Sequence, residues 1–342
     1  MTATTPRLSV IVRSYNRLPW LCELVETLLT QDHDAFEIVV VEQSTDAPPA
    51  AAARLRALEA DPRLRVLSHR PLGGARARNV GVAASRGAVL VFIDDDDLPV
   101  GRAFLRAIEA RFDADPRCLG LSVRQSWEDG EAMSRIYRAR ARRRCMRFSP
   151  LLKLPYTYVR HDAPVARVDY VHGTGGALRR EVLARVGGWD EDTPIEDEVS
   201  IAYRLRPALR PGEYLTFFPG AHLRRRMDVG GGLAKRKATT AGFFRRYLTF
   251  VHHILGRYHR TRVLALYPLY VLAGWTYVME WLWNDLRDQT TFARRLGGAL
   301  GFTLAFPVLA ARELWRARLG RRPGSGEALA VTVRAPAVVS GG

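Results

Sequence analysis

Four consecutive carboxylates, Asp94 to Asp97, directly follow the apolar run VLVFI at residues 89–93. Neighbouring carboxylates repel one another, so gathering them costs free energy unless a cation or a proton relieves the repulsion. Mg²⁺ and Mn²⁺ prefer carboxylate oxygens and are commonly held by one or two carboxylates together with substrate phosphates. The alternative is an Asp-rich helix start, but a single Asp suffices as an N-cap. The pattern therefore favours a divalent-cation site at the end of a buried strand.

A second group of carboxylates, EDE at residues 196–198, opens a helical pattern. A carboxylate held there could take the proton of an attacking hydroxyl group, which is the task of a general base. The alternative is a solvated first turn whose acidic side chains are stabilised by the helix dipole. The residues alone leave these alternatives open.

These side chains must be positioned by the elements that the first hundred residues predict. Apolar strands alternate with helical patterns, which predicts a parallel sheet wrapped by helices. In such sheets, functional residues lie beyond the carboxyl ends of the strands. Three polar clusters fall there, at residues 13–16, 42–46 and 94–97. The expected strands are 7–15, 36–44, 64–70 and 88–97, and the expected helices are 18–31, 51–60 and 73–87.

Charge and cysteine content narrow the class of protein. The 342 residues include 52 Lys or Arg and 35 Asp or Glu, a formal net charge of +17. This surplus favours a polyanionic partner such as anionic lipid or a diphosphate. We expect no nucleic acid, because no RNA- or DNA-binding motif is found. The three cysteines are widely separated, which argues against a disulfide framework and fits a reducing cytosol, and no signal-peptide pattern is seen.

Five stretches in order give the chain its family resemblance: LSVIVRSYNR, FEIVVVEQSTD, GGARARNVGVAASRGAVLVFIDDDDLP, GGALRREVLARVGGWDE and IEDEVSIAYRLR. Together they resemble the family 2 glycosyltransferases over about residues 7–225. The resemblance implies an α/β fold of the GT-A type, a Rossmann-like and mostly parallel sheet wrapped by helices. It also implies a nucleotide-diphosphate sugar as donor, Mg²⁺ or Mn²⁺ as cofactor, and inversion at the anomeric centre.

The resemblance also assigns roles to residues that match the family's motifs. Asp197 matches the general base of inverting members, while Asp96 and His222 match positions that bind the metal. For His222 the alternative is a structural side chain. The other residues are expected to bind substrate: Tyr15 stacks on the nucleotide base, Glu42 reads it, Arg78 and Asn79 line the nucleotide and sugar pocket, Asp94 or Asp95 touches the ribose or sugar, and Glu196 shares the acidic motif of Asp197.

Two positions depart from the family's pattern. The sequence Glu42-Gln43-Ser44 stands where the family usually has DDGS, which leaves the identity of the nucleobase open. Arg13 stands where a Pro is common. Neither departure is expected to touch the metal site or the general base.

The sequence changes character after residue 260. The run 263–283 carries one charged residue, Glu280, and a second apolar run covers 296–310. A spanning helix needs about 20 apolar residues, so the first run qualifies marginally and the second is short. We expect membrane-associated helices within 261–320, with anionic lipid as a partner. The alternatives are a buried core helix or a dimer interface.

The predicted domains are a catalytic domain at 1–225, a basic amphipathic connection at 226–260, the apolar helices at 261–320 and a disordered tail at 321–342. The catalytic domain divides at about residue 100 into a nucleotide-sugar half and an acceptor half. The expected activity is sugar transfer to a glycan or lipid-linked acceptor in cell-surface polysaccharide or glycolipid synthesis, at the cytoplasmic face of the membrane. The alternatives are a soluble enzyme of secondary metabolism and an inactive nucleotide-sugar-binding subunit.

Overall fold

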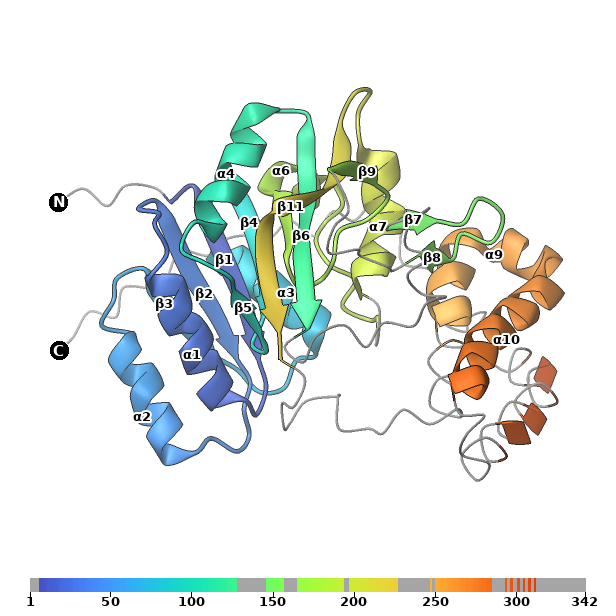
Figure 1. The fold of residues 1–342 in the computed structure, drawn as a ribbon, viewed down its shortest axis with the longest axis horizontal. Coiled ribbons are helices and arrows are strands. Elements are labelled where there is room, and N and C mark those ends of the chain that lie inside the picture. The colour runs from blue at the N-terminus through green and yellow to red at the C-terminus, as the bar shows by residue number, and fades with distance from the viewer. Residues whose placement is uncertain are drawn as a thin grey trace, which may run out of the picture.

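A computed structural model describes residues 6–127, 146–156, 165–193, 197–226, 247 and 250–284, with single positions scattered from 293 to 311. Its centre is one large mixed sheet with helices packed on it, and the C-terminal helices lie at one end (Figure 1). Most of the arginine-rich stretch 135–147, residues 227–246 and the expected tail 321–342 lie outside the described residues.

The N-terminal half alternates strands and helices as the sequence predicts. The strands β3, β2, β1 and β4 are neighbours in this order and all run parallel. Their carboxyl ends therefore meet at one edge of the sheet. The elements are β1 (Leu8–Ser14), α1 (Leu18–Leu29), β2 (Phe36–Glu42), α2 (Pro49–Leu58), β3 (Leu64–Ser68), α3 (Gly74–Ala84) and β4 (Val89–Asp94).

The second half of the sheet is mixed: β6 and β11 run in the direction of the first four strands, and β5, β9 and β10 run against them. The strand β10 is inserted between β4 and β6 and is antiparallel to both. The strand β11 is parallel to β6, while β5 and β9 pair with it antiparallel. The elements are β5 (Asp97–Pro99), α4 (Phe104–Ala114), β6 (Cys118–Trp127), β9 (Ala166–Val168), β10 (Gly176–Arg179), α6 (Arg180–Arg185), α7 (Asp197–Ala208) and β11 (Tyr214–Arg225), with a separate hairpin of β7 (Arg147–Phe148) and β8 (Pro155–Tyr156).

Both faces of the sheet are buried, which explains why the central strands are apolar at nearly every position. Successive side chains of a strand point to opposite faces. In β1, Val10 and Val12 pack in the same hydrophobic cluster as Leu21 of α1, whereas Ile11 packs in the other cluster with Ala75 of α3. The helices on the two faces therefore hold the strand ends rigidly in place.

The C-terminal segment contributes to this core. It comprises a short π-helix, η2 (Phe250–Leu255), followed by α9 (Gly256–Ala265) and α10 (Tyr267–Asn284). Val263 and Tyr270 are fully buried in the same cluster as residues of α7, whereas Leu264, Leu269 and Leu272 are exposed. Among the described residues, none of the helices has both the length and the apolar character needed to cross a membrane.

Candidate active site

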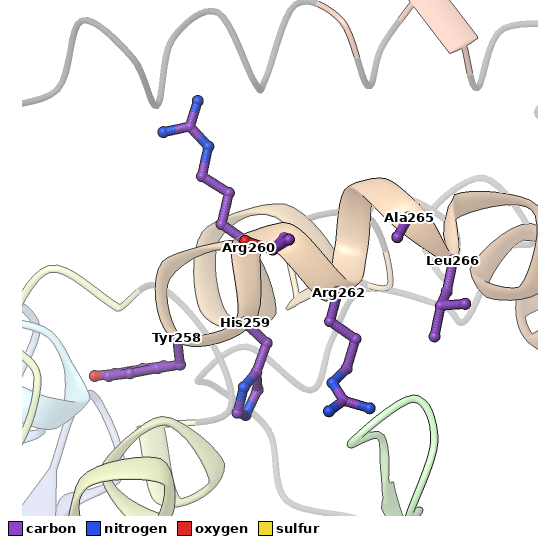
Figure 2. Close-up of a pocket in the computed structure, with 7 residues that line it drawn as sticks. Tyr258, His259, Arg260, Arg262, Ala265 and Leu266 are labelled. Carbon is purple, nitrogen blue, oxygen red and sulfur yellow. The ribbon is translucent and has the colours of Figure 1, made fainter.

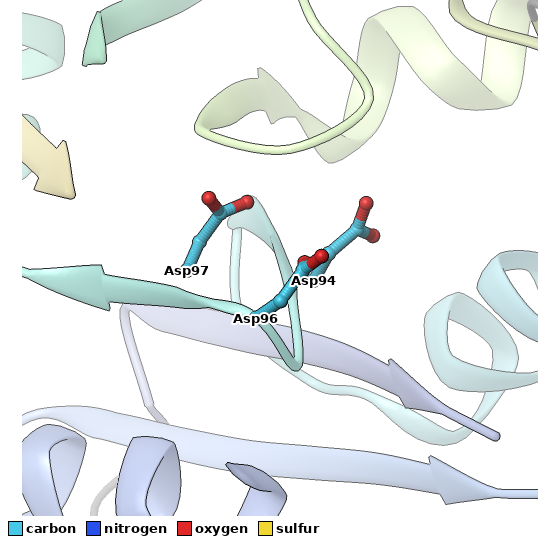
Figure 3. Close-up of side chains that lie close together, drawn as sticks. All are labelled: Asp94, Asp96 and Asp97. Carbon is cyan, nitrogen blue, oxygen red and sulfur yellow. The ribbon is translucent and has the colours of Figure 1, made fainter. Parts of the chain in front are cut away.

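Three of the four consecutive aspartates come together. One carboxylate oxygen from each of Asp94, Asp96 and Asp97 lies within 4.8 Å of the others, and Figure 3 shows the three side chains gathered around the turn. The local cause is the chain path, because β4 ends at Asp94 and β5 begins at Asp97. The side chains of Asp94 and Asp96 remain 19% and 18% exposed, whereas Asp97 is buried.

The fourth aspartate, Asp95, is not part of this group. Its carboxylate accepts hydrogen bonds from Ser14 Oγ at 2.8 Å and from Arg17 Nη1 at 3.0 Å. Burial raises the pKa of Asp95 to about 6, although the nearby Arg17 opposes the shift. Asp95 therefore ties the turn to β1 and to the start of α1, and of the two residues expected at the ribose or sugar only Asp94 lies in the carboxylate group.

An arginine pairs with each member of the group. Arg13 donates to both oxygens of Asp94, with its Nε 2.8 Å from Oδ1. Burial disfavours the charge of Asp94, but Arg13 and Arg78 outweigh burial and hold its pKa well below the usual range. Arg17 Nη1 also lies 3.0 Å from Asp96 Oδ2. The expectation that Arg13 does not touch the metal site or the base is therefore wrong.

The partner of Asp97 is Arg225 in β11, whose Nη2 lies 2.9 Å from Asp97 Oδ2. Thr174 supports the same carboxylate, because its Oγ1 donates to Asp97 Oδ2 at 2.5 Å and accepts from the Asp94 N–H at 3.1 Å. Burial nevertheless raises the pKa of Asp97. Sequence reasoning missed Arg225 and Thr174. Arg225 is opposite Asp97 only because β11 and β5 pair antiparallel, and these strands are too far apart in the sequence for a local pattern to indicate the pairing.

Asp197, the candidate general base, lies beside this group. It is the first residue of α7 and is buried. The guanidinium of Arg78 donates to Asp197 Oδ2, and its Nη2 lies 3.6 Å from Asp94 Oδ1. Arg13 Nη1 lies 3.9 Å from Asp197 Oδ2. Burial alone would raise the pKa of Asp197, but Arg78 and Arg13 lower it, so the side chain is a carboxylate at neutral pH.

Arg78 is held in place on several sides. Its Nη2 donates to the carbonyl oxygen of Gly173 at 2.9 Å, and its guanidinium stacks on the Trp189 ring at 4.7 Å. A Cβ at Gly173 would lie 2.6 Å from Arg78 Nη2, so a glycine is needed for this close approach. Arg78 is predicted to line the nucleotide and sugar pocket. In the structure it also links Asp94 with Asp197.

The residues expected at the nucleobase lie at the ends of β1 and β2. Tyr15 is 41% exposed and free to stack on a ring. Asn16 adopts a left-handed backbone with φ 55°, and its side chain accepts from the Thr45 N–H at 2.9 Å. Glu42 Oε1 accepts from the Ser44 N–H at 2.6 Å. These contacts stabilise the loops after β1 and β2, between which the nucleobase is expected.

Two of the other predicted residues, Asn79 and His222, make contacts within the fold, and a third is not described. The Asn79 side chain bonds to both backbone groups of Trp189 and to Glu191 Oε1, so it fastens the loop after α6. The ring of His222 lies 2.8 Å from Ser126 Oγ, and the structure does not bring it into the carboxylate group. Glu196 lies outside the described residues.

A cavity of about 580 Å³ lies along α9, between Tyr258 and Leu266 (Figure 2). None of the four aspartates lines this cavity. We place the candidate active site at Asp94, Asp96 and Asp97, because their carboxylates lie close together whereas the cavity is open to solvent.

Comparisons with known proteins show the family of the chain. The model of the family described as glycosyl transferase family 2 matches residues 9–187. The glycosyltransferase EpsJ of Bacillus subtilis is 35% identical over 104 residues, which are 30% of this chain and 30% of the relative. The succinoglycan biosynthesis protein ExoO of Rhizobium meliloti is 35% identical over 94 residues, 27% of this chain and 26% of the relative. The chain thus spans about a third or less of these relatives' length.

Two solved structures share the fold. TarS of S. aureus in complex with UDP-GlcNAc gives a TM-score of 0.52 at 18% identity, over 73% of this chain and 66% of that chain. The mannosyltransferase PcManGT from Pyrobaculum calidifontis in complex with GDP-Man and Mn²⁺ gives 0.51 at 20% identity, over 93% and 81%. At these identities the likeness concerns the fold.

Proposed function

Because the chain belongs to glycosyl transferase family 2, we propose that it transfers a sugar, with inversion, from a nucleoside diphosphate sugar to a hydroxyl group. The observation that carries this proposal is the bridge made by Arg78, which contacts Asp94 and Asp197 at once. The same guanidinium group thereby holds both a proposed donor-binding carboxylate, Asp94, and the candidate general base, Asp197. Such fixed geometry is what a bimolecular transfer requires, because orientation removes much of its entropic cost.

The donor would lie across the carboxyl ends of β1, β2 and β4. Exposed Tyr15 would stack on the base, and Glu42 would receive a base N–H. Because Glu42 already accepts from Ser44, its second oxygen is the one left for the ligand. Similar structures hold UDP-GlcNAc in one case and GDP-Man in another, so UDP-sugars and GDP-sugars are both donors to test.

A divalent cation fits the carboxylate group. The donor set is made of hard carboxylate oxygens, which suits Mg²⁺ or Mn²⁺. Asp94 and Asp96 are the proposed ligands because their side chains are partly exposed, whereas Asp97 is buried. When bound, the cation would neutralise the diphosphate of the donor and favour its departure. His222, with its ring against Ser126, would support β6 and β11 rather than bind the ion.

Asp197 would act as the general base toward the acceptor hydroxyl. Its pKa is lowered, so it is ionised and able to accept a proton at neutral pH. Arg78 and Arg13 would hold the carboxylate in position before the acceptor arrives. Since both guanidiniums also contact Asp94, they would keep the base and the donor in register.

We also propose a glycan or lipid-linked acceptor presented at the cytoplasmic face of a membrane, as in cell-surface polysaccharide synthesis. Exposed Leu264, Leu269 and Leu272 on the C-terminal helices and the net charge of +17 support contact with anionic lipid. Flotation with phosphatidylglycerol vesicles tests this part. Protein that stays at the bottom of the gradient in low salt would refute membrane contact and leave the transfer activity to be judged separately.

The experiment that tests the donor assignment is a calorimetric titration of the protein with UDP-, GDP- and dTDP-sugars in MnCl₂ and in EDTA. We expect one nucleotide class to bind, and to bind only with the cation. Absence of binding for all donors would refute the proposed activity.

A further inference from the structure

The loop after α6, residues 189–193, is bonded by side chains of the three helices α3, α7 and α9. On one side, Arg76 and Asn79 of α3 bond to Glu191. On the other side, Arg257 of α9 forms a two-point ion pair with Asp192, at 2.9 and 3.0 Å. The loop therefore connects the donor half of the sheet with the C-terminal helices.

Asp190, in the middle of this loop, joins α9 directly to α7. Its Oδ2 accepts from Ser200 Oγ at 2.5 Å and from the Tyr258 hydroxyl at 2.7 Å. Its Oδ1 lies 2.9 Å from Arg204 Nη2. The Asp190 side chain is only 10% exposed, so these bonds are sheltered from water. Burial and the Asp190 charge raise the pKa of Tyr258 to about 12, so the hydroxyl keeps the proton that it donates.

Apolar packing supports the same contact. The Tyr203 ring of α7 lies 5.5 Å from the Tyr258 ring and 5.1 Å from the His259 ring. Val199 of α7 and Leu255 and Val263 of the C-terminal segment are fully buried in one cluster. In Figure 2 the Tyr258 side chain extends away from α9, on the opposite side from Arg260.

We propose that Tyr258 and Arg257 are positioning residues for the general base, so that the C-terminal helices form part of the catalytic unit. Asp197 begins α7, and Ser200 and Arg204, which hold Asp190, lie one and two turns further along the same helix. Because a hydrogen-bonded helix moves as one body, fixing Ser200 and Arg204 fixes the direction of Asp197. The family match ends at residue 187, so these contacts lie beyond it. The inference rests on the proposed role of Asp197.

The test compares Tyr258→Phe with Tyr270→Phe in the full-length protein. Tyr270 is a matched control: its hydroxyl also links a C-terminal helix to the catalytic domain, at 2.8 Å from the Leu152 carbonyl oxygen, but it does not reach the loop. Hydrolysis of UDP-GlcNAc and GDP-mannose in MnCl₂ reports kcat and KM, and hydrogen exchange reports the opening of α7. Tyr258→Phe should lower kcat about 10-fold with KM unchanged, and should speed exchange of α7 amides about 10-fold.

Tyr270→Phe should leave kcat and α7 exchange within about two-fold of the wild type. In an Asp197→Asn background, Tyr258→Phe should have no further effect on kcat, because two residues that act through one step are not additive. Equal behaviour of the two Tyr variants, or an additive double variant, would overturn the positioning role. If the wild type hydrolyses none of a panel of UDP-, GDP- and dTDP-sugars, the proposed activity fails. Unchanged α7 exchange in Tyr258→Phe would overturn the positioning role independently.

Discussion

Replacing Asp197 by Asn should leave donor affinity nearly unchanged and lower sugar transfer by about 10²- to 10⁴-fold, the usual cost of losing a general base. The amide keeps the shape of the side chain but cannot accept the acceptor's proton. The Asp197 carboxylate is buried beside the guanidinium groups of Arg78 and Arg13, which stabilise its negative charge. Calorimetry gives the donor affinity, and release of the nucleoside diphosphate gives the rate.

Glu213→Gln is the control for this variant. Glu213 is also paired with an arginine, Arg185 at 2.6 Å, but it lies directly before β11 and outside the site. We expect its transfer rate to equal that of the wild type. Near-normal turnover in Asp197→Asn would assign the base to another carboxylate, for which Glu198 and Glu196 are the nearest in sequence.

Replacing Asp96 by Ala should weaken cation-dependent donor binding by about 10²-fold or more, since even outer-shell partners of a metal cost 10- to 100-fold when removed. Asp96 and Asp97 could each share an ion with Asp94, and Asp96 is the more exposed of the two. Its removal leaves Arg17 still paired with Asp95. The turn should therefore keep its structure. Calorimetric titration with the donor in MnCl₂ and in EDTA measures the difference.

Asp113→Asn serves as the control for loss of one negative charge, because Asp113 is half exposed and pairs with Arg7 on the surface. Its donor affinity should not change. If Asp96→Ala binds the donor as tightly as the wild type in MnCl₂, Asp96 is not a ligand.

The parallel half of the fold could be predicted because its signal is local. Strands such as β1 and β4 are apolar throughout, each is followed by an amphipathic or Gly-led helix, and a chain of this kind must return to the same edge. The insertion of β10 between β4 and β6 could not be predicted, since its four residues pair with strands distant in sequence. Local patterns do not specify such pairings.

The gathering of aspartates at a strand end could be predicted from the sequence, but the contacts of each carboxylate could not. The run of aspartates predicts a carboxylate group at the end of β4. Which of the aspartates belong to the group depends on the turn between β4 and β5, and Asp95 bonds to Ser14 instead. Arg13 was misjudged although it is the register partner of Asp94 in the neighbouring parallel strand. Once that register is assumed, a basic residue beside an aspartate cluster is an expected charge partner.

The C-terminal run shows where hydrophobicity alone does not distinguish environments. The apolar residues of 263–276 are divided between the core, as for Val263 and Tyr270, and the surface, as for Leu264 and Leu272. Composition counts both kinds alike, whereas tertiary packing separates them. The buried core helix, one of the alternatives open from the sequence, thus describes one face of this segment.

The most direct test of the account is the anomeric configuration of the first sugar product formed by the wild-type protein. Proton NMR can follow consumption of UDP-GlcNAc or GDP-mannose, both α-linked donors, in MgCl₂ and in EDTA. We predict that one donor is consumed, only in MgCl₂, and that the first product is the β anomer. An α product, an equal rate in EDTA, or no consumption of a panel of nucleotide sugars would contradict a cation-dependent, inverting transfer with Asp197 as its base.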